Sequence, residues 1–150
     1  MERIELARFA GEVGQRFEFL VGSYGMEGPE SSDLLLPSVF YRRPELLVAV
    51  FLDQNRDHPG RRIGVSVSLA AAHISRAGLP GLVEAAGFAP AHHVAWKAHT
   101  VAVAQHTLDN NATWLRRLMP LLLEPEALDL ARKRTRRPGR RPRNITWKYA

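Results

Sequence analysis

The sequence predicts an α+β fold, in which an N-terminal helix packs on a three-stranded antiparallel β-meander and further helices follow. Three observations indicate this order. Apolar residues recur at helical spacing near the N-terminus, three β-branched or aromatic segments follow with short connections, and proline and glycine divide the second half into helix-length stretches. We assign residues 1–125 to a globular domain and residues 126–150 to a final helix and a basic, Arg/Pro-rich tail.

The first helix is predicted over Ile4–Val21. Seven apolar residues fall on one side when successive residues are turned by about 100°; they are Leu6, Phe9, Ala10, Val13, Phe17, Leu20 and Val21. Gly22 is a suitable stop, because glycine often follows the end of a helix. The next stretch, Gly28–Asp33, has the composition of a loop.

Three strands are predicted after this loop. Ser38–Arg42 contains β-branched and aromatic residues, and Leu46–Leu52 is apolar at every position, which is typical of a strand covered on both faces. Ile63–Leu69 alternates between apolar and small or polar residues, as a half-buried strand does. The connections are short, so antiparallel pairing is expected, with the N-terminal helix covering the apolar face.

Three helices are predicted in the second half. Pro80–Ala86 has proline in its first turn and Gly87 beyond its end. A longer helix is expected from His99 to Met119, stopped by Pro120, and the last one from Glu126 to Arg137.

The strongest compositional feature is the charge of the last twenty residues. Residues 131–150 contain nine basic side chains and no acidic one, whereas residues 1–130 contain 12 basic and 15 acidic residues, a net charge of −3. The basic residues are Arg132, Lys133, Arg134, Arg136, Arg137, Arg140, Arg141, Arg143 and Lys148. A run of like charges repels itself and is stabilised by a polyanion. We call this segment, Arg132 to Lys148, the C-terminal arm.

The composition of the arm favours nucleic acid as the polyanion. The stretch Arg136–Arg143 resembles an AT-hook, and the resemblance implies binding in the minor groove of A·T-rich DNA. It departs from the Arg-Gly-Arg-Pro core of that motif, because Pro138 precedes Gly139 and an additional arginine precedes Pro142. Trp147 and Tyr149 add aromatic rings, which can stack on unpaired bases.

We therefore expect a non-enzymatic module whose arm binds nucleic acid. The order of helix, β-meander and helices resembles many small uncharacterised bacterial α+β proteins, some of them immunity proteins. This resemblance implies an alternative, in which the module neutralises a toxin through its sheet or loops. Two further alternatives remain: an arm that binds an acidic protein or a membrane surface, and a structural tail in which residues 145–149 form an edge strand.

Composition limits the cellular setting. The chain contains no cysteine, so disulfides, thiolate metal sites and a cysteine nucleophile are excluded and a reducing cytoplasm is expected. The first residues do not resemble a secretion signal. The longest clean apolar run, Leu46–Leu52, is too short to span a bilayer.

No pattern of catalytic or metal-binding residues is found. His99 and His106 are predicted on the wet face of their helix, about 10 Å apart along its axis, too far to share one ion. Asp53–Asp57 begins like a calcium loop, but His58 and Gly64 replace the required glycine and glutamate. Nucleophile-elbow and phosphate-loop motifs are also absent from the sequence. We therefore predict no catalytic residue, no metal site and no cofactor.

Overall fold

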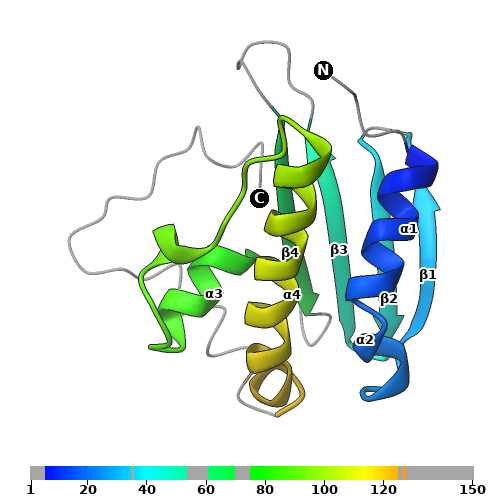
Figure 1. Ribbon diagram of the computed structural model, residues 1–150. Helices are drawn as coiled ribbons and strands as arrows, with labels where there is room; N and C mark the ends of the chain where they lie inside the picture. Colours follow the sequence, from blue (N-terminus) through cyan, green and yellow to red (C-terminus); the bar gives the residue numbers. More distant parts are fainter. Residues whose placement is uncertain (1–5, 35, 54–60, 70–74, 125–126, 128–150) are drawn as a thin grey trace.

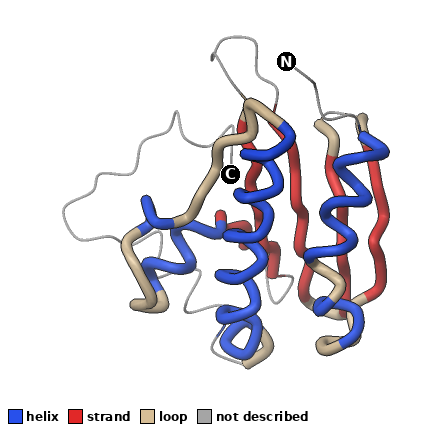
Figure 2. Tube along the Cα trace, in the orientation of Figure 1, coloured by secondary structure: helices blue, strands red, loops and turns tan. Residues whose placement is uncertain are grey.

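Five antiparallel strands form one sheet, and α1 and α4 lie side by side over one of its faces (Figures 1 and 2). The computed structural model describes residues 6–34, 36–53, 61–69, 75–124 and 127. The strands follow the chain in order across the sheet: β1 (Glu27–Ser32), β2 (Ser38–Arg43), β3 (Leu46–Asp53), β4 (Arg62–Leu69) and β5 (Ser75–Gly78). The helices are α1 (Leu6–Arg16), α2 (Phe19–Gly22), α3 (Leu79–Ala85), η1 (Ala91–His93) and α4 (Val101–Leu122).

The core lies between the helices and the covered face of the sheet. Val48 and Val50 of β3 lie opposite Val67 and Val65 of β4, and all four are at most 2% exposed. Alternate residues of a strand point to the same face, so this register places one continuous apolar row beneath the helices. The α+β class, the three central strands and their antiparallel order are thus confirmed.

The opposite face of the sheet is less deeply buried. Leu47 and Phe51 of β3 are half-buried there, and Ala49 between them is buried. The expectation that β3 is covered on both faces is therefore met only in part among the described residues. The Phe51 ring lies over Gly64, where an added Cβ atom would overlap it. Packing across the strands thus shields part of this face.

The predicted N-terminal helix is interrupted. It ends at Arg16, and the short α2 begins at Phe19. Phe17 and Phe19 are both buried, with ring centroids 6.2 Å apart. In a continuous helix these two side chains would point about 200° apart. A break between them brings both to the core.

Two edge strands were missed by the sequence prediction. The Gly28–Asp33 stretch was predicted as a loop, which is wrong, because Glu27–Ser32 forms β1 and pairs with β2. Proline is tolerated on an edge strand, and the register shifts between Glu27 and Glu30, so the irregular composition is compatible with pairing. The fifth strand, β5, pairs with β4 and has only four residues.

The helices of the second half are placed much as expected. The first, α3, corresponds to the predicted Pro80–Ala86, and Gly87 follows it with φ +77°, a conformation that suits glycine. The prediction that the long helix stops before Pro120 is wrong, because α4 continues to Leu122. Leu122 is 3% exposed, so burial holds the last turn in helical form despite the proline. The predicted helix from Glu126 to Arg137 lies, except for residue 127, outside the described residues.

A polar network joins α1 to α4. Arg16 of α1 contacts the Glu12 carboxylate at 2.5 Å and donates from Nε to Asp109 of α4 at 2.7 Å. Gln105 of α4 donates to the other Glu12 oxygen at 3.0 Å. The hydrogen bond from Gln105, followed by the interactions with Arg16, lowers the pKa of Glu12 below its ordinary 4.5, and partial burial opposes this.

This network predicts a loss of stability in acid. A lowered pKa in the folded state contributes stability that is present above the unfolded pKa and is lost as pH falls through the folded value. Below about pH 4.5, the free energy of unfolding should therefore fall more for the native chain than for Glu12→Gln. Urea unfolding between pH 3 and 6 measures this difference. Glu27→Gln, at an exposed carboxylate on β1, is the control, and parallel pH profiles for the native chain and Glu12→Gln would contradict the prediction.

A second stability prediction concerns Tyr41 in the core. Its side chain is 0% exposed, burial raises its pKa to about 12, and its hydroxyl has no hydrogen-bond partner among the described residues. Since an unsatisfied buried hydroxyl is costly, Tyr41→Phe should raise the free energy of unfolding by about 1 kcal/mol. Chemical denaturation measures the change, with Tyr24→Phe at a half-buried tyrosine as the control. A destabilised Tyr41→Phe would mean that the hydroxyl forms a hydrogen bond.

Candidate functional site

The segment before α4 extends the sheet next to the first residues of β4. Lys97 lies opposite Arg62 in an isolated antiparallel bridge. Two backbone hydrogen bonds flank this pair, from Ile63 N–H to the Trp96 carbonyl at 2.8 Å and from Ala98 N–H to the Arg61 carbonyl at 3.0 Å. The backbone of residues 96–98 is thereby fixed to the sheet.

Three polar side chains of α4 hold the same segment from the other side. Thr107 Oγ1 donates to the Lys97 carbonyl at 2.5 Å, and Asn111 Nδ2 donates to the Ala95 carbonyl at 2.8 Å. Asn110 Oδ1 accepts from the Ala95 N–H at 2.8 Å. Residues 95–98 are therefore hydrogen-bonded to both β4 and α4.

Two of the α4 side chains that hold residues 95–98 are deeply buried. Thr107 and Asn111 are each 1% exposed, and the other buried side chains with a polar group among the described residues are Ser66 and Tyr41. Burying a polar group is costly unless it is hydrogen-bonded. Both α4 residues meet this requirement by binding the segment that carries Trp96.

Trp96 itself is 50% exposed to solvent. The Arg62 guanidinium lies 5.9 Å from its ring centroid and the Lys97 ammonium 5.8 Å, near the outer limit of a cation–π contact. Arg62 and Lys97 are themselves exposed. We call these three residues the Trp96 platform.

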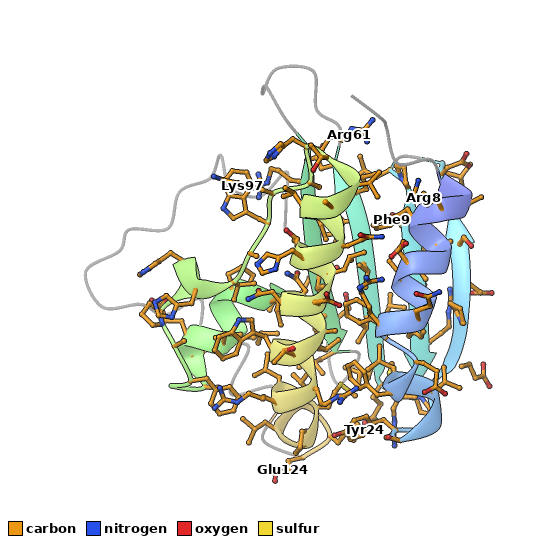
Figure 3. All side chains as sticks on the ribbon, viewed as in Figure 1. Arg8, Phe9, Tyr24, Arg61, Lys97 and Glu124 are labelled. Carbon is orange, nitrogen blue, oxygen red and sulfur yellow. The ribbon has the colours of Figure 1, made fainter. Side chains whose placement is uncertain are left out.

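The surroundings of the Trp96 platform are predominantly basic. Figure 3 shows Arg61 and Lys97 at the same end of the molecule, where α4 begins. Asp53 lies opposite Arg62 in the β3–β4 register, so three cationic side chains share this end of the two strands with one described carboxylate. This balance favours an anionic ligand over a cationic one.

The structure describes only some of the candidate residues predicted from the sequence. The predicted nucleic-acid-binding residues, from Arg132 to Tyr149, lie outside the described residues, and so does most of the loop that begins at Asp53. His99 and His106 are exposed, which confirms their predicted position on the wet face. Within the described part of the chain, no group of three or more His, Cys, Asp or Glu side chains could hold a metal ion.

The Trp96 platform was not found from the sequence. Two local signals could have drawn attention to it: a tryptophan next to a lysine in a segment without apolar periodicity, and adjacent asparagines inside a helix, where such residues are unfavourable unless they bind backbone groups. Neither signal points to Arg62, because the contact between Arg62 and Trp96 depends on the pairing of segments that are distant in the sequence.

Comparisons of the chain with protein-family models, with curated proteins and with solved structures give no match. Among the described residues, no helix is both long and apolar enough to cross a membrane. The chemistry of the residues themselves therefore has to indicate the function.

The hydrogen bonds of Asn111 predict a measurable contribution to stability. Asn111→Leu keeps the approximate volume but removes the donor from the Ala95 carbonyl, so the free energy of unfolding should fall by about 1–3 kcal/mol. Thr113→Ala changes an exposed residue two positions along α4 and should alter it by less than about 0.5 kcal/mol. Urea denaturation compares the two variants, and equal effects would show that the contact with residue 95 contributes nothing.

Proposed function

We propose that the protein is a non-enzymatic binding module that engages a polyanion, and that the polyanion is nucleic acid. The Trp96 platform is the observation in the described structure that carries this proposal. It combines a half-exposed aromatic ring with two exposed cations on a backbone fixed by hydrogen bonds. Surfaces that bind nucleic acid use this combination, in which cations contact phosphates and aromatic rings contact bases.

The charge distribution of the chain supports the same function. The C-terminal arm has nine cations, whereas residues 1–130 carry a net charge of −3. Each phosphate that is neutralised releases condensed counterions, so the arm can supply affinity without reading any base. In this proposal the arm provides most of the binding energy and the Trp96 platform provides a fixed point of contact.

A protein partner is the second candidate function, in the manner of an immunity protein that neutralises a toxin. One observation favours it: β1 is an edge strand with five successive exposed residues, including Glu27 and Glu30. An exposed sheet edge can accept a strand from a partner, and its carboxylates would suit a basic one. Because the cations of the arm oppose binding to a basic partner, we place this function second.

The proposed function predicts a steep dependence of binding on salt. Titration of a labelled generic duplex should give an association constant that falls with salt, with a log–log slope of about −4 to −5 if about five phosphates are neutralised. Changing the nine basic residues of the arm to glutamine in the full chain should weaken binding at least tenfold and flatten the slope. The described body should stay folded in that variant, as circular dichroism can verify.

A matched control removes charge from the body. The double variant Arg42→Gln/Arg76→Gln changes two exposed arginines at the end of the sheet away from Arg62, and duplex binding should change by less than about twofold. If the unaltered chain binds neither DNA nor RNA at low salt, the proposed function is wrong and a protein partner becomes the better candidate.

A further inference from the structure

We propose that Trp96 is a stacking site for one unpaired base, and that it gives the body of the protein a preference for single-stranded over duplex nucleic acid. This inference rests on the proposed function and specifies the class of ligand at the Trp96 platform. The ring faces of a base are covered by its neighbours in a duplex but can be exposed in a single strand. An aromatic side chain can therefore discriminate between the two forms.

The Trp96 ring is more accessible than other rings that face cations. The Arg116 guanidinium lies 4.6 Å from the centroid of Phe19, which is buried, and Arg117 lies 4.4 Å from that of Phe88, which is half-buried. At Trp96 the two cations lie farther from the ring, at 5.9 and 5.8 Å, than these guanidinium groups or than Arg117 over Trp114 at 5.2 Å, and half of the residue is open to solvent. The cations thus lie over the Trp96 ring near the outer limit of a cation–π contact, and they leave half of the residue uncovered.

The backbone that carries Trp96 is preorganised. Ala95 is bound through both its N–H and its carbonyl, the carbonyls of Trp96 and Lys97 each accept a hydrogen bond, and the Ala98 N–H donates to β4. A ligand that stacks on Trp96 therefore does not need to order the backbone beneath it, so little conformational entropy is lost on binding.

The two cations of the Trp96 platform are placed side by side. Arg62 and Lys97 lie directly opposite each other and form a non-hydrogen-bonded antiparallel pair. In this type of pair the two Cα atoms are only about 4.5 Å apart, closer than in a hydrogen-bonded pair. Both side chains therefore leave the same face of the sheet, and their charged ends lie 5.9 and 5.8 Å from the indole centroid. They are positioned to contact phosphates on the strand that carries the stacked base, without base-specific hydrogen bonds.

Replacement of Trp96 tests the stacking site in the full-length protein. Fluorescence anisotropy with a labelled oligo(dT) should show that Trp96→Ala lowers affinity for the single strand by roughly 5- to 150-fold, the range given by loss of one base–aromatic stack. Affinity for a labelled duplex should change less than twofold, and Trp96→Phe should recover most of the single-strand affinity. Leu34→Ala, at an apolar residue that is 91% exposed, is the control for loss of apolar surface.

The cations have their own matched pair of variants. Arg62→Gln should reduce the magnitude of the salt slope for oligo(dT) by about 0.7, whereas Arg76→Gln should leave it unchanged. Arg76 of β5 pairs with Ser68 of β4, which is six residues from Arg62 along the strand. Arg76 is therefore about 20 Å from Arg62, on the same face of the sheet.

A direct optical measurement complements the affinities. In the background Trp114→Phe/Trp147→Phe, Trp96 is the remaining tryptophan of the chain, and oligo(dT) should quench its fluorescence while an equal concentration of duplex should not. Unchanged fluorescence with bound oligo(dT), or an equal loss of affinity for both forms in Trp96→Ala, would overturn the stacking site and leave charge-driven binding intact. Failure of the unaltered chain to bind either form would instead refute the proposed function, and the stacking site with it.

Discussion

The position of α4 over the sheet is the constraint on which the rest of the structure depends. Its apolar side chains, among them Leu108, Leu115 and Leu118, are fully buried against the core. Because a helix in this position cannot rotate without exposing them, its polar residues are also fixed in direction. Thr107 and Asn111 point away from solvent, and the backbone of residues 95–97 satisfies their hydrogen bonds. The hydrophobic packing of one helix therefore sets the position of the Trp96 platform.

In the proposed function, this arrangement separates two kinds of contribution to binding. Two residues of the Trp96 platform, Trp96 and Lys97, lie on a segment bound to both the sheet and α4, and Arg62 lies on β4 itself, so the backbone geometry is set before any ligand arrives. The arm contributes charge, which acts at a distance and requires little geometry. In the proposed function the two are complementary, because charge provides affinity for any nucleic acid, whereas a fixed aromatic ring distinguishes an unpaired base from a paired one.

The central part of the fold was predictable because its signals are local. The alternation in β4 and the apolar run in β3 each follow from a few neighbouring residues, and the limits of α3 follow from a proline and a glycine. The sequence predictions that were wrong have a common cause. The first strand, β1, exists because β2 supplies its partner, the helix break before Phe19 exists because two aromatic side chains must reach one core, and α4 passes Pro120 because Leu122 is buried. In each case tertiary packing overrides the local preference.

The sequence by itself determined the net charge of the arm, the lack of cysteine chemistry and the class of the fold, since these depend on composition and short-range periodicity. Only the tertiary structure decided that Trp96 is half-exposed and lies beside Arg62. Its supporting hydrogen bonds join residues 10 to 16 positions apart along the chain, and the pairing with β4 joins segments that are still more distant. Such contacts arise from the way strands and helices pack together, and a linear pattern of residue types does not encode them residue by residue.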